Sequence, residues 1–208
     1  NGAIPEQFDV DLDQGSIKAE MGIHPYAPTI LYIGRMAVQK GPDLLLDAIP
    51  RVTEEYWGMQ DIMAGAGGMR PWLTPVAHDR GLPVRFPGYI SDAEYVRLLN
   101  AADLVVIPSR NEPFGIVLPE AWSAGRPVVA TRACGMPYMV EHEQSGYLVD
   151  YTDTAGWSAA ITRLLQCPEL RQAMGQRGRL LAQQRFAPQV IACKTHRLYR
   201  EKATEGAR

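Results

Sequence analysis

The sequence predicts an α/β fold in which a parallel β-sheet is covered by helices on both faces. Short apolar runs rich in β-branched residues alternate with amphipathic segments of helical period, as they do in βαβ units. Several of these runs, such as Leu104–Ile107, are apolar at consecutive positions. That pattern is typical of strands buried on both faces.

The expected elements follow one another in a regular order. Pro42 suits the first turn of a helix, and Ser91 and Glu94 have the spacing of a capping box. After Val149 the pattern changes to helices alone. The expected strands are 29–34, 61–64, 84–86, 104–108, 128–131 and 146–149, and the expected helices are 43–56, 70–80, 92–101, 115–124, 136–142, 154–166, 168–185 and 188–202.

Composition excludes several classes of protein. The formal net charge of −2 argues against a nucleic-acid-binding face, and no apolar run approaches the roughly 18–20 residues that span a bilayer. The 3 cysteines lie far apart, which suits a reducing compartment, and neither they nor the 4 histidines have the spacing of metal ligands. We therefore expect a cytoplasmic protein without a metal site.

The 208 residues are expected to form a single domain, 1–208, with a linker at its start and a helix at its end. Segment 1–12 is turn-rich and polar, which resembles an inter-domain connection. Segment 186–208 is expected to be a helix with an apolar stripe at Val190, Ile191 and Leu198. We expect the sequence to be the later half of a longer polypeptide.

The first expected strand leads into a candidate anion site. The strand ends at Gly34, Arg35 lies in the next loop, and Lys40 stands where the next helix begins. Ligands of parallel sheets bind in such loops, and two cations beside a helix N-terminus favour a diphosphate. The alternative is two solvated surface cations.

A second candidate group follows the buried strand 104–108. Glu112 lies in the loop after this strand, Gly115 allows close approach of the backbone to a ligand, and Glu120 falls in the first turns of the next helix. The two carboxylates suit the hydroxyl groups of a sugar or a ribose. The same pair also suits the acid and nucleophile of a hydrolase, or a helix cap and a solvated helix face.

Three further loops carry weaker signals. The glycines of 65–68 superficially match a dinucleotide fingerprint, but position 70 is Arg70 and no acidic residue follows at the required distance, so we interpret them as loop glycines. The loop 134–137 offers amides for a phosphate or a sugar, or simply turns the chain. Tyr89 lies after a strand, where it suits either the wall of a base site or, as we favour, the core.

Taken together, these motifs resemble the C-terminal domain of GT-B glycosyltransferases of family 4 (glycosyl transferases group 1). Their order and spacing match over almost the whole chain. The matching stretches are G-R-x4-K-G at 34–41, G-x-G at 65–67, F-x-G at 86–88, A-D-L-x-V-x-P-S at 102–109, E-x-F-G-x4-E at 112–120, G-x-P-V-V-A-T at 125–131 and S-G-Y-L-V at 145–149.

The resemblance implies a Rossmann-like three-layer α/β/α domain, one half of a GT-B fold, with C-terminal helices. It implies that the chain binds a nucleoside-diphosphate sugar of the UDP, GDP or ADP type, with no cofactor or metal, and supports retaining transfer to an acceptor sugar, lipid or small molecule. Arg35 and Lys40 are implied to hold the diphosphate, Glu120 the ribose and Glu112 the sugar. Further donor contacts are implied for Gly34, Tyr89, Ile90, Phe114, Gly115 and Ile116.

The resemblance also implies that the partner of this domain is an N-terminal GT-B domain, on which the helix 186–208 packs. Association with the cytoplasmic face of a membrane would occur through that half. The sequence departs from the family in the loop after strand 128–131, where Cys134 and Tyr138 replace a Gly and a Glu. This change puts the donor contacts of that loop in doubt.

Two alternatives to a transferase domain remain. One is a module that binds a nucleotide sugar without chemistry, and the other is a GT-B nucleotide-sugar hydrolase or epimerase. A nicotinamide-dependent oxidoreductase rests only on the poor glycine match at 65–68.

Overall fold

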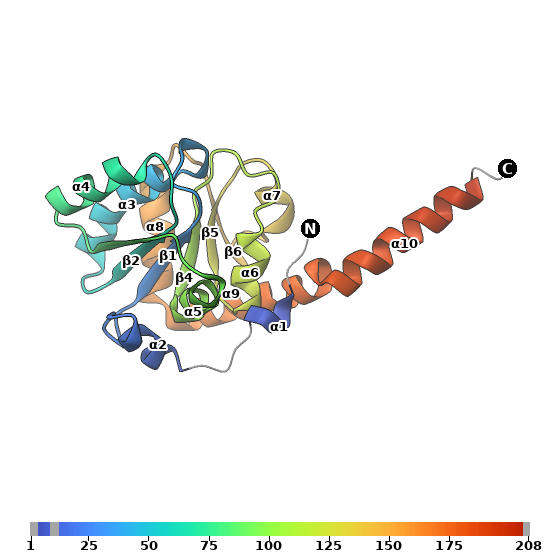
Figure 1. Ribbon diagram of the computed structural model, residues 1–208, viewed down its shortest axis with the longest axis horizontal. Coiled ribbons are helices and arrows are strands. Elements are labelled where there is room, and N and C mark those ends of the chain that lie inside the picture. The colour runs from blue at the N-terminus through green and yellow to red at the C-terminus, as the bar shows by residue number, and fades with distance from the viewer. Residues whose placement is uncertain (1–3, 9–12, 206–208) are drawn as a thin grey trace.

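The computed structural model describes residues 4–8 and 13–205. At its centre is a six-stranded sheet in the order β3-β2-β1-β4-β5-β6, in which all neighbouring strands are parallel (Figure 1). The predicted α/β class with a parallel sheet is therefore confirmed. The strands are β1 Thr29–Ile33, β2 Gln60–Ala64, β3 Val84–Gly88, β4 Leu104–Ile107, β5 Val128–Thr131 and β6 Gly146–Val149.

Helices cover both faces of the sheet and complete the three layers. Within the described residues they are α1 Pro5–Phe8, α2 Gln14–Glu20, α3 Pro42–Glu55, α4 Arg70–Asp79, α5 Asp92–Ala101, α6 Val117–Ser123, α7 Met136–Met139, α8 Thr154–Gln166, α9 Pro168–Leu181 and α10 Pro188–Glu205, with a 3₁₀ turn η1 Val38–Lys40 and a π-helical turn η2 Ala182–Phe186. The buried side chains of α3, α4 and α8 pack on one face, and those of α5, α6 and α7 pack on the other.

Alternate side chains of the strands enter two separate apolar cores. In β1, Ile30 and Tyr32 join the core beneath α3 and α8, whereas Leu31 joins the core beneath α5 and α6. Trp157 and Trp122, both fully buried, each contribute to one of these cores. Strands that are apolar at consecutive positions are thus explained by a sheet that is covered on both sides.

The expected boundaries hold to within a few residues, and the differences have local causes. The helix expected over 136–142 ends at Met139, because Val140 is extended. The helix expected over 168–185 ends at Leu181 and continues as the π-helical turn η2. The capping box of Ser91 and Glu94 is confirmed at the start of α5. The sequence did not predict α1 and α2, since helices of 4 and 7 residues are too short to display a period.

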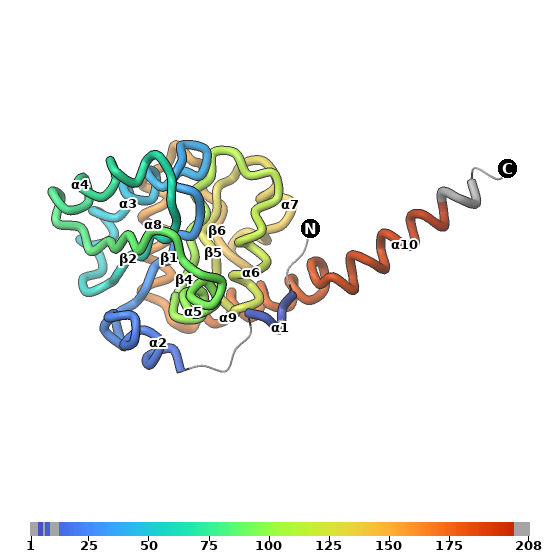
Figure 2. Tube along the Cα trace, viewed as in Figure 1, coloured from blue at the N-terminus to red at the C-terminus, as the bar shows by residue number. Residues whose placement is uncertain are grey.

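The last helix, α10, projects away from the rest of the domain (Figures 1 and 2). Leu198 and Tyr199 are 58% and 74% exposed, whereas Val190 and Ile191 near its start are partly buried. Of the three residues of the expected apolar stripe, Leu198 alone is exposed. None of the helices described here has the length and apolar character needed to cross a bilayer. Parts of the expected linker and terminal helix (1–3, 9–12 and 206–208) lie outside the described residues.

Candidate functional site

Most of the candidate residues follow β1 and β4, which lie side by side in the sheet, whereas Tyr89 and Ile90 follow β3. The chain leaves β1 for α3 on one face of the sheet and leaves β4 for α6 on the other face. The two loops that follow these strands therefore diverge from neighbouring carboxyl ends. A crevice at such a topological switch point is where open parallel sheets bind their ligands.

The loops after β1 and β4 are locked to each other through their backbones. The Arg110 and Asn111 amides both donate to the Gln39 carbonyl, at 2.9 and 3.3 Å. Gly41 has a φ of 64°, and a Cβ atom at this position would overlap with the Pro108 carbonyl. Only glycine therefore lets the two loops approach this closely.

A paired arginine and aspartate reinforce this contact. The Arg110 guanidinium donates two hydrogen bonds to the carboxylate of Asp43, at 2.8 and 2.6 Å, and a third to the Val38 carbonyl at 2.9 Å. Bidentate pairs of this kind fix orientation as well as distance. Sequence reasoning missed this pair, because the two residues lie far apart in the chain and nothing in the local pattern connects them.

Lys40 and Glu112, both predicted site residues, meet between these loops. Lys40 Nζ donates to Glu112 Oε2, and the Ser109 hydroxyl donates to the same oxygen at 3.2 Å. Glu112 is only 8% exposed, and the side chain of Lys40 is 29% exposed. An ammonium group has three donors, so Lys40 can bind Glu112 and an incoming anion together. The helix-cap reading of Glu112 is wrong, because no side-chain cap hydrogen bond is present at the start of α6.

Arg35 occupies an exposed position at the end of β1. The Tyr32 hydroxyl donates to its carbonyl at 2.9 Å, which fixes the backbone, while within the described residues its side chain has no hydrogen bond or ion pair. Gly65 and Gly67 have φ values of 134° and 153°, and a Cβ on either would overlap with the Arg35 loop at the carbonyls of Gly34 and Met36. The loop-glycine interpretation of 65–68 explains these contacts without a dinucleotide.

Glu120 belongs to a neighbouring cavity of about 540 Å³. Gly34 and Ile116 line this cavity with it, so three predicted donor residues share one hollow. The Tyr95 hydroxyl donates to Glu120 Oε2. Burial raises the pKa of Glu120, which the Tyr95 hydrogen bond opposes, and burial together with the Glu120 charge raises the pKa of Tyr95. Sequence reasoning missed Tyr95, whose place in α5 looks like that of an ordinary core residue.

The glycine of the E-x-F-G stretch has a structural reason. Gly115 has a φ of 71°, and a Cβ there would overlap with the side chain of Met136. This left-handed residue also explains why α6 begins at Val117 rather than at the expected 115. Phe114 turns away from the loop and packs edge-on against Phe186, with ring centroids 6.0 Å apart.

The loop 134–137 lies directly against this stretch. The Gly135 amide donates to the Glu112 carbonyl at 3.3 Å, and a Cβ at Gly135 would overlap with the Pro113 carbonyl. Cys134 adopts a left-handed φ of 53°. The loop thus braces the backbone of the site, and Tyr138 beyond it is 87% exposed.

Tyr89 and Ile90 follow the carboxyl end of β3. The interpretation of Tyr89 as a core residue is wrong, because its side chain is 86% exposed. The cause is Gly88, which has a φ of 83° and turns the chain outward as β3 ends. Ile90 is partly buried against the core beneath α5 and α6.

Comparison with known proteins gives the family of this arrangement. The profile of a family described as glycosyl transferases group 1 matches residues 13–181. The chain is 35% identical over 218 residues to a D-inositol 3-phosphate glycosyltransferase from Corynebacterium jeikeium (strain K411), with 100% of this chain and 52% of that protein covered. The chain thus spans about half the length of this relative.

Solved structures agree with this relationship. Sucrose-phosphate synthase from Thermosynechococcus elongatus is 26% identical and superposes with a TM-score of 0.82, over 98% of this chain and 52% of that one. Anabaena Alr3699/HepE in complex with UDP-glucose is 24% identical and superposes with a TM-score of 0.84, over 98% of this chain and 56% of that one. The second likeness concerns the fold alone.

Proposed function

The chain belongs to the glycosyl transferases group 1 family, and on this premise we propose that it is the donor-binding domain of a retaining GT-B glycosyltransferase of family 4. Its ligand is a nucleoside-diphosphate sugar, and its reaction is transfer of the sugar to an acceptor sugar, lipid or small molecule. The observation that carries the proposal is the Lys40–Glu112 ion pair at the β1/β4 switch point, beside the exposed Arg35 and the Glu120 cavity.

Each residue has a role that follows from its surroundings. Arg35 and Lys40 neutralise the diphosphate, since one is exposed at the end of β1 and the other keeps free donors beside Glu112. Glu112, held by Lys40 and Ser109, accepts hydrogen bonds from the sugar hydroxyls. Glu120, in the cavity with Gly34 and Ile116, accepts from the ribose. Tyr89 and Ile90 border the base, and the backbone of 114–116 lies beside sugar and phosphate.

Electrostatic stabilisation of the leaving group is the chemistry that these residues supply. Negative charge develops on the departing nucleoside diphosphate as the sugar–phosphate bond breaks. Fixed cations and backbone amides at that position lower the barrier. This mechanism requires no metal ion, and the chain's own Arg35 and Lys40 take the place of one.

The acceptor and the complete active site require a second domain. The chain spans about half of its relatives, and α10 projects away from the domain with Leu198 and Tyr199 exposed. We therefore propose that an N-terminal GT-B domain supplies the acceptor contacts, and that the isolated chain binds the donor without transferring it. We place the complete enzyme in the cytoplasm, where any membrane contact would be made by the other half.

Calorimetric titration of the chain with UDP, GDP and ADP tests the donor site. We expect one of these nucleotides to bind. Arg35→Ala and Lys40→Ala should each weaken its binding by about 1–3 kcal/mol, as for charge-assisted hydrogen bonds. Arg51→Ala, which removes an exposed charge on α3, is the matched control and should leave affinity unchanged. Equal affinity in all variants would disprove the anion site. Nucleotide binding without transfer in the complete protein would favour the non-catalytic module, and free sugar or an isomer as product would favour the hydrolase or epimerase.

A further inference from the structure

A second polar cavity, of about 360 Å³, lies at the opposite end of the strands from the donor loops. Asp103, one residue before β4, and Arg126, two residues before β5, form part of its wall. Because the sheet is parallel, these positions mark the amino ends of the strands, whereas Lys40 and Glu112 follow the carboxyl ends. The rest of the described wall comes from α2, from the loop between α6 and β5, and from α9, which supplies Arg171, Gln172 and Gln176.

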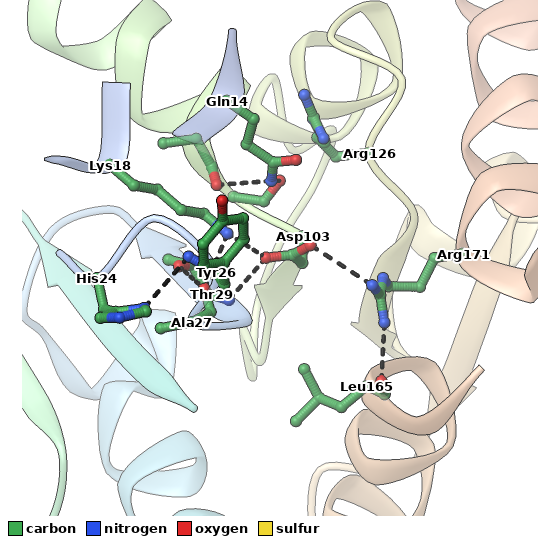
Figure 3. Close-up of polar contacts among 12 residues, drawn as sticks. Gln14, Lys18, His24, Tyr26, Ala27, Thr29, Asp103, Arg126, Leu165 and Arg171 are labelled. Atoms are coloured by element: carbon green, nitrogen blue, oxygen red, sulfur yellow. Dashed lines mark hydrogen bonds and ion pairs between the residues drawn. The ribbon is translucent and has the colours of Figure 1, made fainter. Parts of the chain in front are cut away.

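Among the described residues of this wall, Arg126 and Arg171 lie near one carboxylate, that of Asp103. The carboxylate of Asp103 is already engaged elsewhere (Figure 3). Its Oδ2 atom accepts from Lys18 Nζ at 2.7 Å and from the Thr29 amide at 2.8 Å. Arg171 Nη2 lies 3.6 Å from its Oδ1 atom. One carboxylate is therefore divided between two cations, and Arg126 forms no ion pair among the described residues.

Arg126 is the least satisfied of these cations. Its Nη2 atom donates to the Asn100 carbonyl at 2.8 Å, while its Nε atom is buried without a hydrogen-bond partner. Burial lowers the pKa of Arg126, and the nearby Arg179 and Arg171 add to this effect against the opposing charge of Asp103. Negative charge placed in the cavity would offset the cost of holding this guanidinium in its buried position.

We propose that this cavity binds the phosphate group of a small hydroxylated molecule. The guanidinium group of Arg126 suits a phosphate oxygen. Arg171, whose Nη1 atom donates to the Leu164 and Leu165 carbonyls at 2.7 and 2.8 Å, offers its remaining N–H groups. Gln172 and Gln176 extend from α9 into the wall and offer amides to hydroxyl groups. The volume falls within the range of small-molecule sites, about 300–1,000 Å³. This site is separate from the donor site and does not depend on the proposed transferase activity.

Glycerol 3-phosphate is a suitable probe, and glycerol is its neutral counterpart. The probe's phosphate would also occupy the donor site, so the titrations use the chain with Arg35→Ala and Lys40→Ala. We expect calorimetry to detect binding of glycerol 3-phosphate and none of glycerol. Gln172→Glu and Gln176→Glu each replace an amide by a carboxylate of nearly the same shape. Both positions are exposed, so folding is expected to be unaffected. Each should weaken binding by about tenfold or more, as for like charges in an interface.

Gln189→Glu is the matched control, since it adds the same charge on α10 at an exposed position outside the cavity wall. It should bind the probe as the parent chain does. Absence of binding in the parent, or equal weakening in all three glutamate variants, would overturn the proposal.

Discussion

At the scale of single residues, the two glutamates of the site occupy different surroundings. Glu112 is paired with Lys40 and bonded to Ser109, so its charge is compensated by the protein. Glu120 has only the Tyr95 hydroxyl as its partner among the described residues, in a cavity that raises its pKa. Two carboxylates separated in this way suit two different hydroxyl groups of one donor better than a concerted acid–base pair.

Substitution of each glutamate tests this division. Glu120→Gln is expected to weaken binding of the nucleoside diphosphate and of the complete sugar donor alike, by about 1–3 kcal/mol, because both ligands contain the ribose. Glu112→Gln is expected to weaken chiefly the binding of the complete sugar donor. The two variants are compared by calorimetry with the nucleotide and with the nucleotide sugar. Equal losses of both ligands in both variants would contradict the assignment.

The pH dependence of nucleotide affinity follows from the same contact. Because burial raises the pKa of Glu120, this carboxylate becomes protonated at a higher pH than an ordinary glutamate, whose pKa is about 4.3. The proposed ribose contact to the carboxylate should therefore weaken as pH falls through this raised pKa, and Glu120→Gln should abolish that part of the dependence.

Asp61 in β2 predicts a change in stability rather than in binding. It is fully buried, neither carboxylate oxygen has a hydrogen-bond partner in the described structure, and burial raises its pKa well above the usual value. The folded state therefore holds a proton that the unfolded state releases above about pH 4. This contribution to stability is full below that pH and is lost progressively as pH rises.

Asp61→Asn should accordingly raise the free energy of unfolding at pH 7, by on the order of 1–3 kcal/mol, and flatten its dependence on pH. Urea unfolding at pH 5 and pH 7 measures both effects. Asp79→Asn is the control, because the side chain of Asp79 is 77% exposed. A variant that is less stable than the parent at pH 7 would show that Asp61 has a favourable partner.

At the scale of elements, the site depends on how closely the loops after β1 and β4 approach each other. Gly41→Ala is expected to destabilise the chain by more than about 2 kcal/mol, because a left-handed alanine is strained and its Cβ meets the Pro108 carbonyl. Thermal unfolding and nucleotide affinity should both decline. Gly58→Ala, with a φ of 86° and no atom near its Cβ, measures the backbone strain alone. Equal effects at both glycines would refute the steric argument.

The elements were largely predictable from sequence, whereas several contacts were not. Apolar runs such as Leu104–Ile107 predicted the strands because a sheet buried on both faces leaves few polar positions. Lys40 and Glu112 were predicted as site residues from their places after β1 and β4. The pairing of Lys40 with Glu112 depends on the approach of two loops, and that of Tyr95 with Glu120 depends on the packing of α5 near α6. Both bring together distant segments, about which local sequence carries no information. The exposed Tyr89 was misjudged because Gly88 sends the chain outward.

At the scale of the whole molecule, α10 predicts how the chain behaves alone and together with the proposed N-terminal domain. Leu198→Ser and Tyr199→Ser should change the stability of the isolated chain by less than about 0.5 kcal/mol, since both side chains are exposed. In the complete protein the same changes should lower stability and transfer activity, because the proposed N-terminal domain covers this surface. Unchanged stability and activity of the complete variants would separate α10 from the domain interface.

The contact between Gln39 and Arg110 also has a consequence for the order of folding. It joins loops that are about seventy residues apart in the chain, with β2, β3 and their helices between them. Closing so long a segment costs entropy before any contact is gained, so contacts of this separation form slowly. A nucleotide that binds between these two loops binds only those protein molecules in which β1 and β4 have already paired. It should therefore slow unfolding and leave the rate of folding nearly unchanged.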